Sequence, residues 1–483
     1  MIDGLKPYPA YKDSGVPWLG HVPAHWEIRR NKLLLTEVDV RSQDGSEELL
    51  SVSQYTGVNR RRDKLSEDGE LLTKASSLIG YKCVRAGDLV MNIMLAWNGS
   101  LGVSDIGGIV SPAYCVFRSR GDVEPRFLHY LLRTPLLTGV FKMASTGVVD
   151  SRLRLYPDVF LRLPSLRPPP MEQSTIARFL NHADHRIRRY IAAKRKLITL
   201  LNEQKQAIIN RAVTRGLDPN VPLKPSGVEW LGDVPEHWRV SQVRRLVSLV
   251  TSGSRGWASY YSDTGAVFLQ SGNLGRSMSL NLSFIQRVDP PEGSEGERTR
   301  VHRDDILVCI TGALTGNVVL VDSELSSPAY VNQHVALVRP VPSAVHPRYL
   351  ASVLFSRVGT IQFKSSEYGG TKQGLGLNDV KSALVTLPPL SEQIAISSVL
   401  DAELARLGDV ITNIQREIHL VREYRTRLIA DVVTGKLDVR DVAANLPDEA
   451  EESVPVEEEH LLGENGVEDE DAEPEGALPE DES

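Results

Sequence analysis

The chain of 483 residues has few cysteines and no long apolar run. Cys83, Cys115 and Cys309 are its three cysteines, and their wide spacing excludes a disulfide framework and a C-x-x-C metal clip. No stretch of about 18 apolar residues is present, which excludes a membrane-spanning helix. Residues 1–6 also lack the apolar core of a signal peptide. We therefore expect a protein of the reducing cytoplasm.

The sequence also lacks the motifs of three enzyme classes. A methyltransferase acting on amino groups needs an aromatic residue after two prolines, but the nearest match is Asp289-Pro290-Pro291-Glu292. A phosphate-binding loop is missing, because Gly435-Lys436-Leu437 has neither the spacing nor the hydroxyl of G-x-x-x-x-G-K-[ST]. Glu203-Gln204-Lys205 has the letters of a metal-dependent nuclease but lies inside an expected helix. The chain is therefore predicted not to be an enzyme and to bind no metal.

Charge is divided unevenly along the chain. Residues 441–483 carry 18 acidic residues and no Lys or Arg, whereas residues 1–440 carry 55 basic and 44 acidic residues, a net charge of +11. A basic body suits a polyanion such as DNA. The tail contains four prolines and no aromatic residue, so it is expected to be disordered, and a solubilising role explains its charge.

The strongest feature is an internal repeat. Residues 14–26, SGVPWLGHVPAHW, recur 212 positions later as residues 226–238, SGVEWLGDVPEHW, with ten of thirteen positions identical. In both halves a proline-rich stretch then precedes a Glu-Gln pair, Glu172-Gln173 or Glu392-Gln393. His25 and His237 recur between Pro and Trp without a companion nucleophile, so a structural role is expected for both.

Each half continues into a long segment typical of helix. Residues 171–215 contain no glycine or proline, and residues 391–434 contain one glycine, Gly408. At 1.5 Å per residue such a helix spans roughly 65 Å, so it needs an equally long partner. Steps of four and three predict a coiled-coil seam. The predicted seam is Ile176, Leu180, Ala183, Ile187, Tyr190, Lys194, Leu197, Leu201, Gln204 and Ile208 with Ile396, Leu400, Glu403, Leu407, Val410, Ile414, Glu417, Val421, Tyr424 and Leu428.

Two separate amphipathic helices, each lying on its own domain, would give a similar pattern. The matched lengths and endings of the helices favour the coiled coil. Six seam positions are the predicted partner-binding residues of the helices: Ile187, Leu197, Leu201, Leu407, Ile414 and Val421.

The segments between these landmarks have α/β (α+β) character. Strands are expected at residues 88–94 and 305–310, each followed by a glycine-containing turn. We predict a first domain at 1–170, a long helix at 171–216, a second domain at 217–390, a second long helix at 391–440 and the tail at 441–483. The two domains share anchors but differ between them, which indicates one fold with two different surfaces.

These motifs resemble a known family. The repeated S-G-V-x-W-L-G-x-V-P-x-H-W opener looks like the segment that introduces the target-recognition domains of type I restriction–modification specificity subunits. So does Leu387-Pro388-Pro389-Leu390-Ser391-Glu392-Gln393 before a long helix that closes in Val433-Thr434-Gly435-Lys436-Leu437-Asp438. The resemblance covers residues 11–440. In the first half Leu166-Arg167-Pro168-Pro169-Pro170 departs from the pattern, which affects the local loop.

The resemblance implies two target-recognition domains related by a pseudo-twofold repeat and separated by two long antiparallel helices. It implies a sequence-specific subunit that recognises a bipartite, asymmetric target in double-stranded DNA. It also implies assembly with two methyltransferase subunits and with ATP-dependent restriction subunits that translocate and cleave DNA. In such a complex S-adenosylmethionine, ATP and Mg²⁺ are used by the partner subunits, and no cofactor is bound by this chain.

Candidate DNA contacts fall in three stretches and at one further residue, Arg276. Arg60, Arg61, Arg62 and Lys64 form a basic stretch suited to phosphates or guanine edges, although an ordinary solvated loop explains it equally well. In the second half, Lys372 and Gln373 lie in a glycine-rich stretch that looks like a DNA-facing loop of the family, where Gln373 could read adenine. The matched first-half region supplies Arg152 and Arg154, with Asn92 and Asn98 nearby; Arg276 completes the set.

Two other classes of function remain as alternatives to a DNA-recognition subunit. A standalone enzyme would cleave or methylate DNA by itself, and the missing motifs argue against it. A purely structural coiled-coil scaffold would leave the assembled complex without sequence-specific DNA binding.

Overall fold

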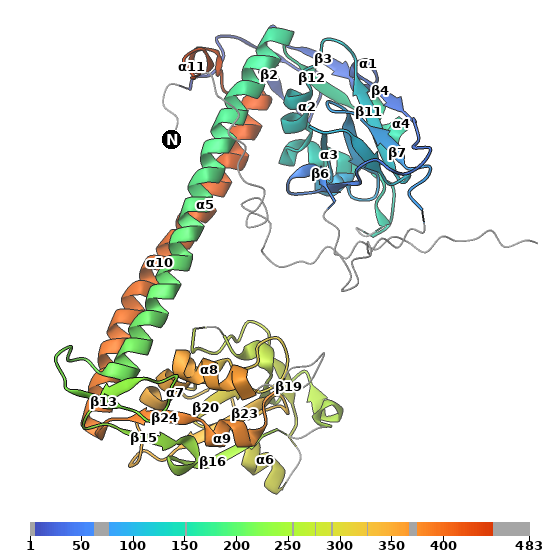
Figure 1. Cartoon of the computed structure of the whole chain (residues 1–483). Helices are drawn as coiled ribbons and strands as arrows, with labels where there is room; N and C mark the ends of the chain where they lie inside the picture. Colours follow the sequence, from blue (N-terminus) through green and yellow to red (C-terminus); the bar gives the residue numbers. More distant parts are fainter. Residues whose placement is uncertain are drawn as a thin grey trace, which may run out of the picture. The chain divides into compact units, whose positions relative to one another are not determined.

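A computed structural model describes residues 5–61, 77–149, 152–253, 256–275, 277–290, 293–325, 327–366 and 374–447. The chain divides into two compact units. The first combines Met1–Arg195 with Gln415–Ser483, and the second comprises Lys196–Ile414. Both units mix helices and strands, which confirms the expected fold class (Figure 1).

The first unit is built on a four-stranded antiparallel sheet in the order β4-β11-β8-β9. Phe127, Phe141 and Phe160 come from three helices and pack with Phe117 of β11 in one fully buried core. The elements are β1 (Tyr11–Asp13), β2 (His21–Pro23), β3 (Glu27–Arg30), α1 (Asn31–Leu34), β4 (Leu35–Val38), β5 (Leu50–Ser53), β6 (Gly57–Arg60), β7 (Lys82–Val84), β8 (Leu89–Asn92), η1 (Ala96–Asn98), β9 (Leu101–Val103), β10 (Gly108–Val110), β11 (Tyr114–Ser119), α2 (Pro125–Leu132), α3 (Pro135–Ala144), α4 (Pro157–Arg162) and β12 (Pro164–Arg167).

The second unit repeats this frame. Its sheet β16-β23-β20-β21 matches β4-β11-β8-β9, the pair β15-β24 matches β3-β12, and the hairpin β13-β14 matches β1-β2. A further sheet, β17-β19-β18-β22, belongs to this unit. The elements are β13 (Leu223–Pro225), β14 (Asp233–Pro235), β15 (Arg239–Gln242), η3 (Val243–Arg245), β16 (Val247–Ser252), η4 (Trp257–Tyr260), β17 (Tyr261–Ser262), β18 (Ala266–Leu269), η5 (Ser271–Asn273), β19 (Gln286–Val288), α6 (Ser294–Thr299), β20 (Ile306–Cys309), β21 (Val318–Leu320), β22 (Ala329–Val331), β23 (Val335–Pro340), α7 (Pro347–Phe355), α8 (Arg357–Ser366), α9 (Leu377–Ser382) and β24 (Leu384–Leu387).

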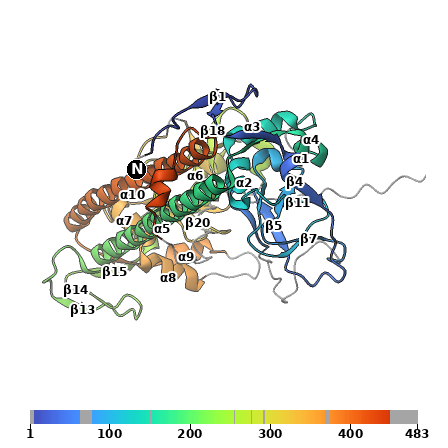
Figure 2. The same cartoon turned by 90° about the horizontal axis from the view of Figure 1, so that it is seen from above.

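The two expected long helices are present. Helix α5 (Pro170–Arg215) has 46 residues and α10 (Leu390–Val433) has 44, and the two lie side by side in Figure 1 and Figure 2. Asp184 contacts Arg425, whereas Lys194, further along α5, contacts Glu417, which lies earlier in α10. The helices therefore run antiparallel, and the predicted coiled-coil packing is confirmed.

The predicted seam is wrong at alternate positions. Leu407 and Ile414 are buried as expected, and Ile187, Leu201 and Val421 are half-buried. In contrast, Tyr190, Leu197 and Val410 are 39%, 40% and 42% exposed, and the next residue in each case is more buried. The Tyr190 hydroxyl still donates to Glu417 of α10. Ile191 is 2% and Ile411 8% exposed. Because both neighbours are apolar in each pair, the sequence pattern fits either order of the four-three steps.

The end of the described chain differs from the expected boundary at residue 441. Helix α11 (Arg440–Ala444) crosses it, because Val439 and Ala443 are fully buried in the core of the first unit. The acidic tail that was predicted to be disordered lies outside the described residues from residue 448 onward. No helix in the part of the chain that the structure describes combines the length and apolar character of a membrane span.

Candidate nucleic-acid interface

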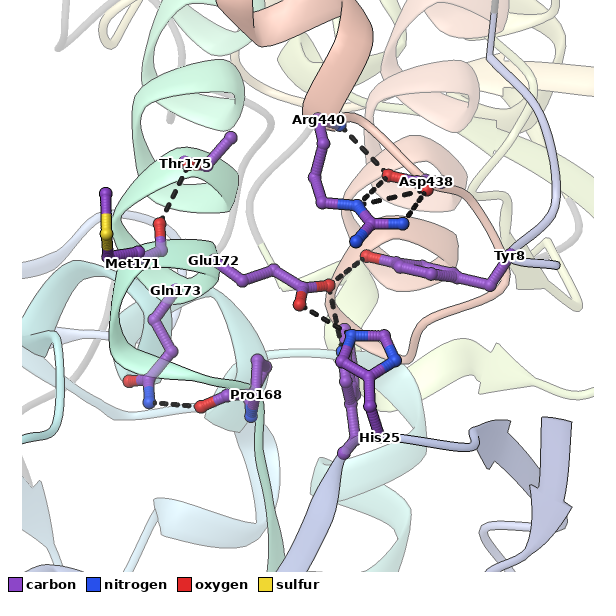
Figure 3. A network of polar contacts seen from close by, with 10 residues as sticks. Tyr8, His25, Pro168, Met171, Glu172, Gln173, Thr175, Asp438 and Arg440 are labelled. Carbon is purple, nitrogen blue, oxygen red and sulfur yellow. Dashed lines mark hydrogen bonds and ion pairs between the residues drawn. The ribbon is translucent and has the colours of Figure 1, made fainter. Parts of the chain in front are cut away.

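A buried carboxylate at the start of α5 anchors the first unit. Glu172, 6% exposed, accepts hydrogen bonds from the Tyr8 hydroxyl at 2.6 Å and from the Trp26 indole at 2.9 Å. His25 Nε2 lies 2.7 Å from the same carboxylate. Figure 3 shows Tyr8 and His25 converging on Glu172, with Asp438 and Arg440 beside them. These contacts connect the repeated segment at residues 14–26 to the start of α5. They give His25 a structural role, as the sequence led us to expect.

The neighbouring charges are also fixed by these contacts. Burial and the hydrogen bond to Glu172 raise the pKa of Tyr8 far above its ordinary value, so the phenol stays a donor. Burial raises the pKa of Asp438, but hydrogen bonds from Arg440 outweigh this and hold it below its usual value. Asp438 also donates its backbone N–H to Lys6 at 2.7 Å, which joins the segment after α10 to the start of the chain.

The second unit repeats the anchor with Glu392 at the start of α10. Its carboxylate accepts from the Trp238 indole at 3.1 Å and lies 2.8 Å from His237 Nε2. Both helices end at a glycine with positive φ near the tryptophan. A Cβ on Gly435 would lie 3.1 Å from Trp26, and one on Gly216 would lie 3.2 Å from Trp238. The repeated Trp, Glu and Gly therefore make the same contacts in both units.

The two glutamines of the repeated Glu-Gln pair also make the same contacts in both units. Gln173 donates to the Pro168 carbonyl at 2.8 Å and accepts from Glu124 N at 2.9 Å, just before α2. Gln393 donates to Pro388 and accepts from His346 N, both at 2.8 Å, just before α7. A buried aspartate at the start of each central strand completes the frame. Asp88 pairs with Arg118, and Asp305 pairs with Arg339.

On this frame the predicted DNA contacts of the first unit are placed unequally. Asn98 is exposed and donates to the side-chain oxygen of Gln54, in the turn between β5 and β6. Asn92 is 4% exposed, and its side chain accepts from Met94 N at 3.0 Å. Asn92 therefore shapes the turn that carries Asn98 and does not reach the surface.

Arg152 and Arg154 are exposed and lie in a loop closed by the bridge between Thr146 and Arg154. Leu155 N donates to Ile93 O at 2.9 Å, which brings this loop beside the turn of Asn98. The sequence match between the two halves holds here, because Leu375 N donates to Ile310 O at 2.8 Å in the second unit. Leu155 and Leu375, which follow the predicted loops along the chain, thus make the same contact in the two units.

Arg60 and Arg61 lie elsewhere, at the far end of the β5–β6 hairpin from its turn. Arg60 is exposed and pairs with Glu48 at 3.2 Å. Arg62, Lys64, Arg276, Lys372 and Gln373 lie outside the described residues. The structure therefore brings together Asn98, Arg152 and Arg154, and leaves Arg60 and Arg61 apart from them.

Three further side chains were missed by sequence reasoning. Gln54 and Tyr55 form the turn against Asn98, and Tyr55 is 56% exposed. Arg133, at the end of α2, donates to the carbonyls of Gln54 at 2.9 Å and Gly99 at 2.9 Å, and so binds both turns. The sequence does mark Arg133. Aligning the two halves places it opposite Phe355 at the end of α7, so a charged residue in the first unit replaces an apolar one in the second.

Comparison with known proteins agrees with this geometry. Residues 295–420 match the family model of the type I restriction modification DNA specificity domain. A putative type I restriction enzyme MjaX specificity subunit of Methanocaldococcus jannaschii is 24% identical over 330 residues, covering 67% of this chain and 70% of the relative. The type I restriction enzyme EcoBI specificity subunit of Escherichia coli is 22% identical over 365 residues, covering 74% of this chain and 75% of the relative.

The chain is similar to type I restriction–modification specificity subunits. Its fold also matches a chain in a solved structure concerning complex assembly and conformational transition of the type I R-M system. The TM-score is 0.62 at 15% identity, with 85% of this chain and 98% of that chain covered. Both relatives are named as specificity subunits of restriction enzymes, which agrees with the prediction that this chain is not itself an enzyme.

Proposed function

We propose that this specificity subunit recognises a bipartite, asymmetric DNA target, with each unit reading one half-site. The observation that carries the proposal is one frame bearing different side chains at matched positions. Counting from the central strands β8 and β20, Asn98 in the first unit corresponds to Thr315 in the second. Each follows the matching strand of the sheet in its own unit, and each precedes a glycine with positive φ, Gly99 or Gly316. Two units that share a fold but carry different side chains at matched surface positions suit two unlike half-sites.

An exchange of domains tests this proposal. Residues 30–160 would be replaced by the matching segment of another specificity subunit, and the modified sites would be mapped in a genome that carries the complete system. We expect the first half-site to change and the second to stay the same. A change in both half-sites at once would contradict independent reading by the two units.

We further propose that two methyltransferase subunits and ATP-dependent restriction subunits assemble on this chain in the cytoplasm. These partners would use S-adenosylmethionine, ATP and Mg²⁺, and this chain would hold no cofactor. Exposed apolar side chains on the long helices support a protein partner there, since Leu197 is 40%, Leu200 51% and Leu420 57% exposed. Replacing Leu200 by aspartate is expected to weaken co-purification of the methyltransferase without unfolding the chain.

The acidic tail has a proposed role of its own. Removal of residues 448–483 deletes 17 acidic residues and leaves the buried part of α11 in place. We expect stronger non-specific DNA binding at low salt, where charges are least screened, and a difference that shrinks as salt rises. Identical binding of the full and shortened chains across a salt series would remove the tail from this role.

A further inference from the structure

Three segments of the first unit meet without any acidic residue among them. Residues 49–61, 89–104 and 134–149 contain no Asp or Glu. They are joined by the Asn98–Gln54 hydrogen bond and by Lys142, whose Nζ lies 5.0 Å from the Trp97 ring centroid. The loop of Arg152 and Arg154 is attached beside them through Leu155 and Ile93. Lys142, Arg152 and Arg154 supply positive charge to this surface, which suits a phosphate backbone.

The turn that carries Gln54 is held from beneath by a buried arginine. Arg133 donates to four carbonyl oxygens, those of Ser53 at 3.3 Å, Gln54 at 2.9 Å, Gly99 at 2.9 Å and Leu101 at 2.5 Å. Burial and the nearby Arg425 and Arg188 lower the pKa of Arg133 to about 10, so it remains charged at neutral pH. A charged donor shared by both turns fixes their relative position.

His129 packs close to the turns that Arg133 contacts, and it leaves them little room to move. His129 lies against the start of β6, and a Cβ placed on Gly57 would be 2.9 Å from its ring. His129 Nδ1 accepts from Val103 N at 3.2 Å. The β5–β6 turn and the Asn98 turn are therefore set on a rigid base, as a specificity element requires.

We propose that Gln54 and Asn98 act as one adenine-reading element for the first half-site, positioned by Arg133. Asn98 Nδ2 donates one of its two N–H groups to Gln54 Oε1, which leaves Gln54 Nε2 as a donor and Asn98 Oδ1 as an acceptor for a ligand. Adenine presents an N7 acceptor beside an N6 donor in the major groove, whereas guanine presents two acceptors. A donor beside an acceptor therefore fits adenine, whereas guanine offers no donor to Asn98 Oδ1. This inference rests on the proposed function, because it concerns the base preference of the first unit.

The test uses the full chain together with its methyltransferase subunits. Bound duplexes are selected from a pool in which both half-sites are randomised, and folding of each variant is checked by thermal unfolding. We expect Gln54→Ala and Asn98→Ala each to reduce the preference for adenine about tenfold at the same single position of the first half-site. The double variant should lose no more at that position than either single variant, because the two amides act as a unit.

Two variants serve as controls. Arg133→Lys keeps a positive charge but has fewer donors, and it should reduce discrimination at that same position while the second half-site is unchanged. Thr315→Ala, at the matched position of the second unit, should leave the first half-site as it is. Unchanged adenine preference in folded Gln54→Ala and Asn98→Ala, or effects at two different positions, would overturn the inference and leave the proposed function standing. A wild-type complex that selects no sequence would overturn both.

Discussion

Where α2 of the first unit has His129 and Arg133, α7 of the second unit has Ala351 and Phe355. Both helices begin with Pro-Arg and contact the matching edge strand of the sheet in their own unit, β9 or β21, and Ala351 is fully buried. In the first unit polar side chains hold the surface turns from below, whereas in the second apolar packing fills the same place. The Trp-Glu anchor and the Asp-Arg pair are retained in both. These two differences therefore lie beneath the turns of the first unit that are proposed to read DNA.

The largest expected effect concerns the helix pair. In the first unit Asp184 is buried between Arg188 and Arg425; burial raises its pKa, but the two guanidinium groups hold it below the usual value. Matching the helix starts and ends pairs Asp184 with Leu404 and Arg425 with Lys205. We expect Asp184→Leu to destabilise the first unit by about 4 kcal/mol, because it leaves a buried arginine uncompensated.

Adding Arg425→Lys to Asp184→Leu reproduces the arrangement of the second unit and should recover part of this loss. Hydrogen exchange of α2 amides in the full chain measures the stability of the first unit in each variant. If the double variant is no more stable than Asp184→Leu alone, the Leu-Lys contact of the second unit cannot replace the Asp-Arg contact of the first.

A second comparison concerns the anchoring glutamates. Glu172 accepts from Tyr8 and Trp26 at 6% exposure, whereas the side chain of Glu392 is 29% exposed and accepts from Trp238. Glu172→Ala should cost about 3 kcal/mol and Glu392→Ala about 1 kcal/mol, because more buried donors lose their acceptor in the first unit. The free energies of unfolding would be compared by hydrogen exchange of β3 and β15. Equal losses would mean that Tyr8 adds nothing to the first anchor.

Much of the frame could be predicted from the sequence because it depends on repeated residues. The opener, the Glu-Gln pair and the glycine after each helix recur, and each has the same contact in both units. The long helices were also predictable from their length and spacing. Their seam was not, because Tyr190-Ile191 and Val410-Ile411 offer two apolar neighbours, and only packing decides which one is buried.

The candidate site was less predictable for the opposite reason. Arg152 and Arg154 were found by matching the halves, but Gln54 lies in a hairpin with no repeated counterpart, so no pattern marked it. Asn92 shows a second limit. Its position as the last residue of β8 suggests a surface amide, yet its side chain is buried and accepts from Met94 N. The base preferences proposed for the first unit depend on such orientations, which spacing does not fix.

The third prediction is that acid weakens the first unit through a group that the second unit lacks. Burial, with help from Arg133, lowers the pKa of His129 from 6.5 to about 3. The unfolded chain therefore binds a proton below pH 6.5 that the folded unit rejects until about pH 3, so stability from this group is lost as pH falls through that window. At pH 5 the loss is about 2 kcal/mol.

Hydrogen exchange at pH 7 and pH 5 would locate this loss in β9 and α2 and spare β21 and α7. His129→Gln keeps an acceptor for Val103 N but does not titrate, so its first unit should respond less to pH. A response as large as that of the wild type would assign the acid sensitivity to other groups.

The smallest expected effect lies on the helices of the second unit. Leu197 is 40% exposed, whereas Leu407 of α10 is 7% exposed. Leu197→Ala should change the free energy of unfolding by at most about 0.5 kcal/mol, because the side chain keeps much of its contact with water. Leu407→Ala should cost about 3 kcal/mol, since it removes a buried side chain and leaves a cavity. Denaturant unfolding of the full chain with both variants measures the difference.

A loss of 2 kcal/mol or more for Leu197→Ala would restore Leu197 to the seam. A stable Leu197→Ala chain that co-purifies less methyltransferase would instead place this leucine on the surface offered to the partner.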